Sequence, residues 1–259
     1  MEPSPLPGRC RSVSRSPNHG PRLGGGPIDM VVIHYTAMSD ADGAIRHLCD
    51  PASEVSCHWV LGRDGKAVQL VSEERRAWHS GAGRWGTVRD VNSRSIGIEL
   101  DNDGFSPFPE AQVAALIALI RGIRLRHPAI TPERILGHSC VAPWRKNDPG
   151  PFFPWRRLAA EGLAVWPEGA ARAPVATLPG NLSRIGFPAG PTPGDVRLRG
   201  FRLRFRAERA GRMGPDGPVL PPADEVDAGL AAAVASRWPV AGGPDPMLND
   251  ALDPIRAGA

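Results

Sequence analysis

The sequence has little lysine and no long apolar stretch. Lysine occurs only at Lys66 and Lys146, although the 259 residues include 31 lysines and arginines. No segment approaches the roughly 20 apolar residues of a membrane-spanning helix. Residues 1–27 also lack the apolar run of roughly 7 to 15 residues that a signal peptide needs. We therefore expect no transmembrane segment and a cytoplasmic protein.

Cysteine is scarce as well. Cys10, Cys49, Cys57 and Cys140 form no CxxC pair, and four cysteines are few for a chain of this length. Such usage favours buried free thiols over a disulfide framework. A disulfide between Cys49 and Cys57 is the alternative that remains open.

The formal net charge of +4 comes almost entirely from arginine. A basic excess is typical of proteins that bind nucleic acid or another polyanion. Here the whole chain is rich in Arg, Gly, Pro and Ala, so we interpret the basic excess as a general compositional bias. We expect no nucleic-acid partner, and an arginine-rich nucleic-acid patch is the rival hypothesis.

Hydrophobic periodicity predicts alternating strands and helices in the first two thirds of the chain. Ile96, Ile98 and Leu100 alternate with Ser95, Gly97 and Glu99, which indicates a strand with one packed and one polar face. This alternation predicts an α/β fold, with a mixed central sheet flanked by helices. The expected elements are a buried strand at 30–33, a helix at 41–49, a hairpin within 57–71, a strand at 95–100, a long helix at 110–127 and a short strand at 133–139.

Composition divides the chain into five parts. We expect an irregular segment at 1–27, the α/β domain at 28–165, a linker at 166–179, a small helical domain with its own core at 180–240, and a tail at 241–259. In the helical part, Phe201 and Phe205 lie one helical turn apart. We expect these two rings to face inward while the surrounding arginines stay solvated.

Two histidines stand where strands are expected to end. His34 follows the first buried strand, and His138 follows the last one. Asp148 comes ten residues later, after a loop that could fold back toward His138. Two histidines and an aspartate are a ligand set for catalytic zinc. Satisfied core or turn histidines are the alternative, because the sequence has no HExxH-type motif.

Glu99 and Lys146 extend this candidate site. Glu99 interrupts the apolar strand at 95–100, where a charge is costly without a partner or a task. Beside a metal-bound water it could act as general base. Lys146, two residues before Asp148, could stabilise an oxyanion. A structural Glu99–Lys146 ion pair is the alternative.

Four stretches resemble one known family. VVIHYT, WHSG, SIGIELDN and GHSCVAPWRKNDPGPFFPW, within residues 28–155, are similar to the type-2 N-acetylmuramoyl-L-alanine amidases of the AmpD and AmiD group, which are related to peptidoglycan recognition proteins. The resemblance implies a mixed sheet flanked by helices and hydrolysis of the amide between the muramoyl lactyl group and L-alanine. It also implies zinc as the cofactor and peptidoglycan or muropeptides as substrates. The implied roles are zinc ligands for His34, His138 and Asp148, catalysis for Glu99 and transition-state stabilisation for Lys146.

Two positions depart from the family pattern. The family usually has Asp at position 140 and Gly at position 144, where this chain has Cys140 and Trp144. Because the usual Asp is not a ligand, we expect its loss to alter loop support more than metal binding. Trp144 is expected to add bulk beside the groove and to change which substrates fit. Cys140 as a soft metal ligand is the alternative.

Four further residues are candidates for substrate contacts. Tyr35, His58, Trp78 and His79 could line the groove, where an aromatic ring stacks on a sugar and an imidazole bonds the peptide. Core packing is the alternative for His58 and Trp78.

In the C-terminal part of the chain, residues 182–238 resemble the three-helix peptidoglycan-binding domain of the AmiD group. That likeness raises the periplasm or cell envelope as an alternative location. We expect a monomer, and a module that binds peptidoglycan without cleaving it is the rival function.

Overall fold

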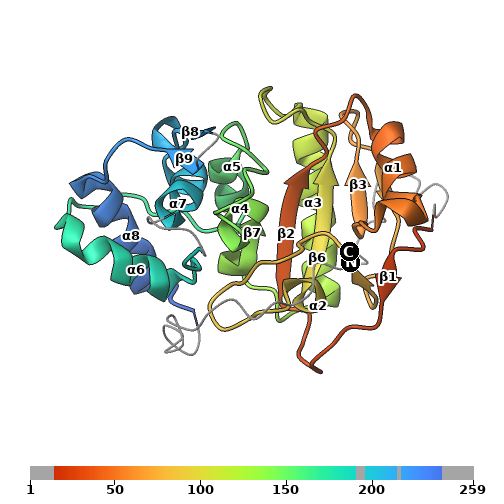
Figure 1. The fold of residues 1–259 in the computed structure, drawn as a ribbon, viewed down its shortest axis with the longest axis horizontal. Helices are drawn as coiled ribbons and strands as arrows, with labels where there is room; N and C mark the ends of the chain where they lie inside the picture. The colour runs from red at the N-terminus through yellow and green to blue at the C-terminus, as the bar shows by residue number, and fades with distance from the viewer. Residues whose placement is uncertain (1–14, 191–195, 215–216, 241–259) are drawn as a thin grey trace, which may run out of the picture.

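A five-stranded mixed sheet forms the centre of the molecule. The computed structural model describes residues 15–190, 196–214 and 217–240, so the predicted tail at 241–259 and Cys10 lie outside the described residues. The strand order is β4-β3-β6-β2-β7, with β3, β6, β2 and β7 parallel and β4 antiparallel at one edge (Figure 1). The strands are β2 (Met30–Tyr35), β3 (Trp59–Leu61), β4 (Ala67–Gln69), β6 (Ser95–Leu100) and β7 (Ile135–Gly137). This mixed sheet confirms the predicted fold class.

Helices cover both faces of the sheet. The long helix α3 (Glu110–Arg126) packs its apolar stripe onto one face, against Ile96, Ile98 and Leu100 of β6. The predicted alternation of β6 is therefore confirmed, and its polar residues point to the opposite face. The other helices around the sheet are α1 (Ala41–Cys49), α2 (Val91–Arg94), α4 (His138–Val141) and α5 (Trp155–Ala160). Short 3-10 turns lie at Pro51–Ser53, Pro132–Arg134, Val175–Thr177 and Ala207–Arg209.

Part of the N-terminal segment is built into the fold. His19–Gly20 forms strand β1, which pairs with β5 (Arg76–Ala77). Asn18 is buried and donates its side-chain amide to the carbonyls of Asp50 and Val55, at 2.8 and 2.9 Å. The expectation of an irregular segment is therefore wrong for these residues. The composition of the segment is typical of a loop. Hydrogen bonds to residues more than 30 positions away hold it in a defined conformation.

A helical unit follows and packs against the sheet. It contains α6 (Leu178–Ile185), α7 (Arg197–Phe205) and α8 (Glu225–Arg237), together with the hairpin β8 (Arg212–Gly214) and β9 (Gly217–Val219). Its apolar residues belong to one cluster with Met30, Val32 and Leu136 of the sheet. The expectation of a separate core is therefore wrong, since three short helices bury their apolar faces against β2 and β7.

The arginines of α7 also differ from expectation. Phe201 and Phe205 are buried as predicted, but Arg199, Arg202 and Arg204 are buried as well. Arg202 is fully buried because it pairs with Asp227, whose carboxylate accepts two hydrogen bonds at 3.1 and 2.5 Å. These three arginines are therefore unavailable to a nucleic acid.

The thiols and the helices bear on two other expectations. Cys57 and Cys140 are buried free thiols, so no disulfide joins Cys57 to Cys49. None of the helices in the described part of the chain has both the length and the apolarity to span a membrane.

Candidate active site

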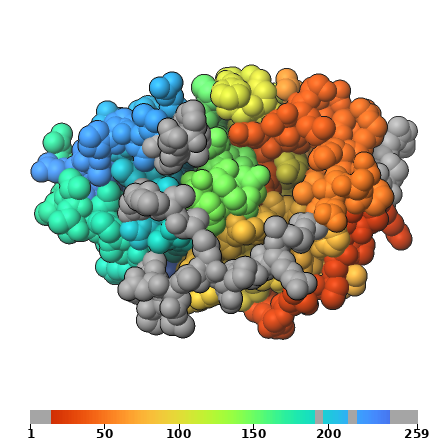
Figure 2. Space-filling model, viewed as in Figure 1, coloured from red at the N-terminus to blue at the C-terminus, as the bar shows by residue number. Residues whose placement is uncertain are grey.

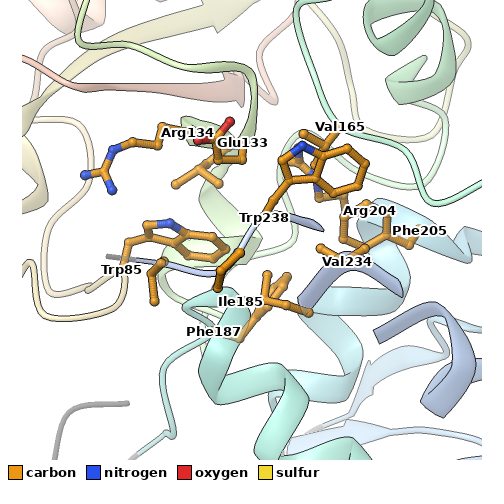
Figure 3. A pocket seen from close by; sticks show the side chains of 13 residues that line it. Trp85, Glu133, Arg134, Val165, Ile185, Phe187, Arg204, Phe205, Val234 and Trp238 are labelled. Atoms are coloured by element: carbon orange, nitrogen blue, oxygen red, sulfur yellow. The ribbon is translucent and has the colours of Figure 1, made fainter. Parts of the chain in front are cut away.

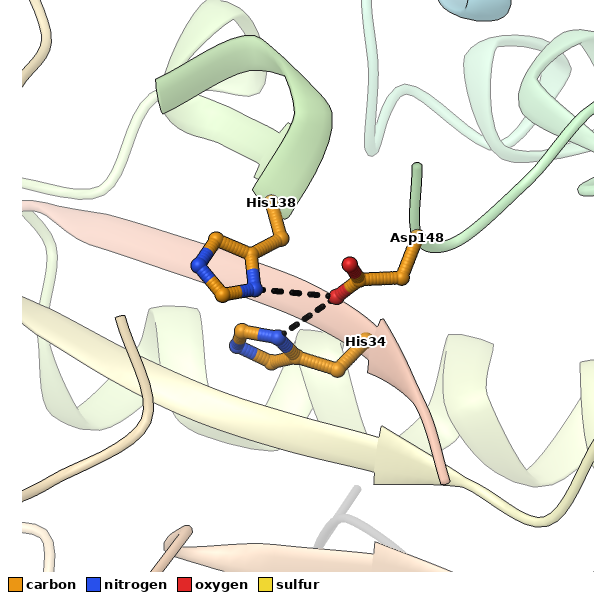
Figure 4. Close-up of side chains that lie close together, drawn as sticks. All are labelled: His34, His138 and Asp148. Carbon is orange, nitrogen blue, oxygen red and sulfur yellow. Dashed lines mark hydrogen bonds and ion pairs between the residues drawn. The ribbon is translucent and has the colours of Figure 1, made fainter. Parts of the chain in front are cut away.

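Three side chains from distant parts of the sequence converge on one point. The Oδ2 atom of Asp148 lies 2.8 Å from Nδ1 of His34 and 3.0 Å from Nδ1 of His138 (Figure 4). All three residues are buried, and their ligand atoms lie within 4.8 Å of one another. Together these three side chains could hold one metal ion.

The parallel strands bring the three side chains together. His34 is the fifth residue of β2, whose Ile33 is in register with Gly137 at the end of β7, so His34 and His138 lie side by side. The backbone carbonyl of Asp148 accepts a hydrogen bond from Ser139 N at 2.9 Å, which returns the loop to α4. A Cβ atom on Gly137 would lie 2.5 Å from Cδ of Pro149, so only glycine permits this close return.

Burial sets the charge of the site. It lowers the pKa of His34 to about 4, helped by the neighbouring His138 and opposed by Asp148. Burial opposes ionisation of Asp148 too, but the two histidines hold the pKa of its carboxyl well below the usual range. At neutral pH the site therefore offers a neutral His34 imidazole and a carboxylate, which is a suitable environment for a divalent cation.

Glu99 lies beside His34 on the same face of the sheet, because the two residues are in register on β6 and β2. Its Oε2 atom is buried and has no hydrogen-bond partner among the described residues. Burial, with the nearby Asp148 carboxylate, raises the pKa of Glu99 to about 8, while Lys146 lowers it. No ion pair joins Glu99 to Lys146 in the described part of the chain, so the alternative of a structural pair is wrong.

A solvent-open groove of about 350 Å³ leads to these residues. In Figure 2 the surface is hollowed between the orange atoms of α1 and the green atoms that follow β7. The groove is lined by the three converging side chains, by Glu99 and Lys146, and by Tyr35, Trp78 and His79. Three of the four candidate substrate-contact residues are therefore placed where a substrate could reach them.

His58 is not in the groove lining. Its side chain is fully buried, Nδ1 accepts a hydrogen bond from Gly97 N at 2.9 Å, and Nε2 lies 3.0 Å from the carbonyl of Arg75. Both ring nitrogens are engaged inside the protein. The expectation that His58 contacts substrate is therefore wrong, because the buried ring is bonded to the backbone of the neighbouring strand β6.

The groove residues that sequence reasoning missed include His47, Arg145 and Asn147. His47 lies three positions after the buried Ala44 on α1, so helical periodicity could have placed both residues on the same face of the helix. Arg145 donates to the carbonyls of Ser80 and Ala82 and thus joins two walls of the groove. No local sequence pattern predicts this contact of Arg145 with the two carbonyls.

Both departures from the family pattern lie away from the converging atoms. Cys140 is buried in the cluster shared by the sheet and the helical unit, and burial raises the pKa of its thiol. Trp144 is absent from the groove lining, and a Cβ atom on Gly190 would lie 3.3 Å from Cβ of Trp144. The alternative of Cys140 as a metal ligand is therefore wrong. The expectation that Trp144 adds bulk beside the groove is wrong as well, because its side chain packs toward Gly190 of the helical unit.

A second cavity, of about 130 Å³, lies between the sheet and the helical unit (Figure 3). Its walls are mostly apolar and include Trp85, Phe187, Phe205 and Trp238. It contains none of the converging side chains. The groove is therefore the better candidate for catalysis.

Three side chains that could hold a metal ion lie next to a buried carboxylate on a mixed sheet, an arrangement that suits metal-assisted hydrolysis. Residues 24–151 match the family described as N-acetylmuramoyl-L-alanine amidase. The amidase AmiD of Escherichia coli K12 is 38% identical over 211 residues, which cover 69% of this chain and 75% of AmiD. The 1,6-anhydro-N-acetylmuramyl-L-alanine amidase AmpD of Haemophilus influenzae is 33% identical and covers 57% of this chain and 89% of AmpD. The chain belongs to the N-acetylmuramoyl-L-alanine amidase family.

Solved structures agree over most of the chain. A complex of E. coli AmiD with anhydro-N-acetylmuramic acid-L-Ala-D-γ-Glu-L-Lys has a TM-score of 0.71 at 31% identity, and covers 84% of this chain and 92% of that one. AmpDh3 of Pseudomonas aeruginosa with an anhydromuramic pentapeptide has a TM-score of 0.72 at 29% identity, with 84% and 95% covered. The match extends beyond residue 151, so these relatives share part of the helical unit.

Proposed function

We propose that this amidase is zinc-dependent and that His34, His138 and Asp148 hold the ion. The observation that supports this proposal is the convergence of two Nδ1 atoms and one carboxylate oxygen within 4.8 Å. Catalytic zinc sites commonly use three such ligands and leave a fourth position for water. The residues present therefore fit the ion that the family implies.

The surrounding residues supply the proton transfers. Zinc, when bound, would polarise the scissile carbonyl and lower the pKa of a water molecule toward about 7. The bound cation would also lower the raised pKa of Glu99 and so favour its carboxylate form. Glu99 then removes a proton as the water oxygen bonds to the carbonyl carbon, and returns it to the nitrogen as the C–N bond breaks. Its unpaired Oε2 atom is available for that exchange. Lys146 supplies positive charge to the oxyanion that forms between the two steps.

The proposed substrates are muropeptides or peptidoglycan, cut between the lactyl group and L-alanine. Support comes from the two similar structures, whose bound molecules are anhydromuramyl peptides. Tyr35 and Trp78 are proposed to contact the sugar or the stem peptide, since both line the groove. Comparing intact sacculi with soluble anhydro-muropeptides as substrates tests whether polymer or fragment is preferred.

Location and assembly are further proposals. We propose a cytoplasmic recycling enzyme, with the cell envelope as the alternative, and cell fractionation distinguishes the two. We also propose a monomer, which light scattering of the purified protein tests.

Metal removal tests the central proposal. Dialysis against a chelator should abolish muropeptide cleavage, and a stoichiometric addition of Zn²⁺ should restore it. Glu99→Ala should keep zinc but lose cleavage, because the carboxylate is not a ligand. An active Glu99→Ala enzyme, or full activity after verified removal of the metal, contradicts the proposed roles.

A further inference from the structure

His79 links a proposed metal ligand to the neighbouring strand. Its Nδ1 atom lies 3.0 Å from Nε2 of His34, and its Nε2 atom lies 3.2 Å from Oγ of Ser95. Oγ of Ser95 in turn lies 2.6 Å from the backbone carbonyl of Val91. These contacts form a continuous chain from a main-chain oxygen to the ring of His34.

The carbonyl of Val91 sets the direction of every proton in this chain. A carbonyl only accepts, so the single hydroxyl proton of Ser95 must point toward it. Oγ of Ser95 can then only accept from His79, which places the proton of a neutral His79 on Nε2. Nδ1 of His79 is left with a lone pair and accepts from Nε2–H of His34. His34 therefore presents its Nδ1 lone pair toward Asp148 and the proposed metal position.

Two further features hold His79 in this orientation. A Cβ atom on Gly97 would lie 2.4 Å from Cγ of His79, so the ring occupies space that only a glycine in β6 leaves open. Oδ1 of Asn92 accepts hydrogen bonds from the backbone nitrogens of His79 and Ser80, at 3.2 and 2.8 Å. Both the ring and the backbone of this segment are thus fixed.

The other proposed histidine ligand is oriented from the same segment. Nε2 of His138 lies 3.0 Å from the carbonyl oxygen of Ser80, which can only accept. His138 therefore carries its proton on Nε2 and presents its Nδ1 lone pair too. Consecutive residues 79 and 80 set the tautomers of both histidines.

We propose that His79 and Ser95 are positioning residues that keep His34 in its metal-binding tautomer. This assignment rests on the proposed metal site and replaces direct substrate binding as the main task of His79. Hydrogen-bond partners of metal-ligating histidines typically change metal affinity about 10-fold to 100-fold when removed. The affinity of the protein for Zn²⁺ should therefore depend on both residues, although neither touches the ion.

Competition between the protein and a chromophoric chelator for Zn²⁺ measures this dependence. Ser95→Ala and His79→Ala should each weaken Zn²⁺ affinity about 10-fold to 100-fold. His79→Asn keeps an acceptor near the former Nδ1 position and should recover part of the loss. The control is His127→Ala, which removes a partly buried histidine bonded to Glu73, away from the site, and should leave the affinity within twofold.

Nitrogen NMR of the metal-free protein provides a readout that a merely structural role would not change. Without the ion, the Asp148 carboxylate 2.8 Å from Nδ1 of His34 favours a proton on Nδ1, and His79 opposes it. The wild type should therefore show a larger fraction of His34 protonated on Nε2 than Ser95→Ala does. If His79→Ala fails to fold, Ser95→Ala, which removes one oxygen, is still decisive. A wild type that binds no Zn²⁺ overturns both the proposed metal site and this assignment. A wild type that binds Zn²⁺, with Ser95→Ala binding equally well and keeping the His34 tautomer, overturns the assignment alone.

Discussion

Replacing Glu99 with glutamine should abolish activity and yet stabilise the metal-free protein. Burial raises the pKa of Glu99 to about 8, from an ordinary value of 4.5. Between these two pH values the unfolded chain has released a proton that the folded protein still binds. The free energy of unfolding therefore falls as pH rises through this window. The amide of Glu99→Gln does not titrate in this range. The free energy of unfolding of the variant, relative to wild type, should therefore rise from pH 4.5 to pH 8 and then level off.

The size of the effect follows from the change in proton affinity. One pKa unit corresponds to about 1.36 kcal/mol, so the rise from 4.5 to about 8 sets a ceiling of about 5 kcal/mol. The carboxyl borders an open groove that admits water, and an amide in its place must also be solvated there. We therefore expect a gain of about 1 to 3 kcal/mol for Glu99→Gln at pH 8.

Denaturant unfolding of chelator-treated protein, followed by tryptophan fluorescence at pH 5 and pH 8, measures this gain. The exposed Glu74 provides a matched control, since Glu74→Gln should leave the pH dependence unchanged. Equal stability of Glu99→Gln and wild type at pH 8 would refute the reasoning, because no cost of burying the carboxylate would then remain.

Three further variants test other parts of the structure. Asp227→Ala leaves the fully buried Arg202 without its partner and should cost about 3 to 5 kcal/mol in denaturant unfolding; a cost below about 1 kcal/mol contradicts this pairing. Gly97→Ala places a methyl group 2.4 Å from an imidazole and should cost about 1 to 3 kcal/mol, whereas Gly20→Ala meets nothing within 4 Å and should be neutral. Lys146→Ala should lower kcat about 100-fold with little change in KM, and an unchanged kcat removes its oxyanion role.

Local patterns were sufficient to predict the main elements of the sheet. The hairpin expected within residues 57–71 and the alternation at 95–100 depend on neighbours within a few residues, and both are present in the structure. His34 and His138 were recognised as candidates because each ends a strand, and parallel strands end at a common edge. These local patterns predict strands and strand ends without any information on contacts between distant residues.

Other features depend on contacts that no local pattern encodes. The sequence of α7 predicts solvated arginines. Arg202 is buried instead, because Asp227, 25 positions later in the chain, provides a buried partner. The sequence predicts that His58 contacts substrate. Its ring is buried instead, because Nδ1 accepts a hydrogen bond from the backbone nitrogen of Gly97, 39 positions away. In both cases the sequence specified the chemistry of the side chain, while its partner decided whether it was buried.

The amino-acid sequence by itself determined the order of strands and helices, the candidate ligands His34, His138 and Asp148, and the carboxylate of Glu99. Only the tertiary structure decided that the two histidines meet one oxygen of Asp148, because His34 is separated from it by 114 positions. The tertiary structure also decided the task of His79, whose ring is useful only between His34 and Ser95. Hydrophobic periodicity is a local property, whereas the direction of a proton in a hydrogen-bond chain depends on every group that the fold brings into it.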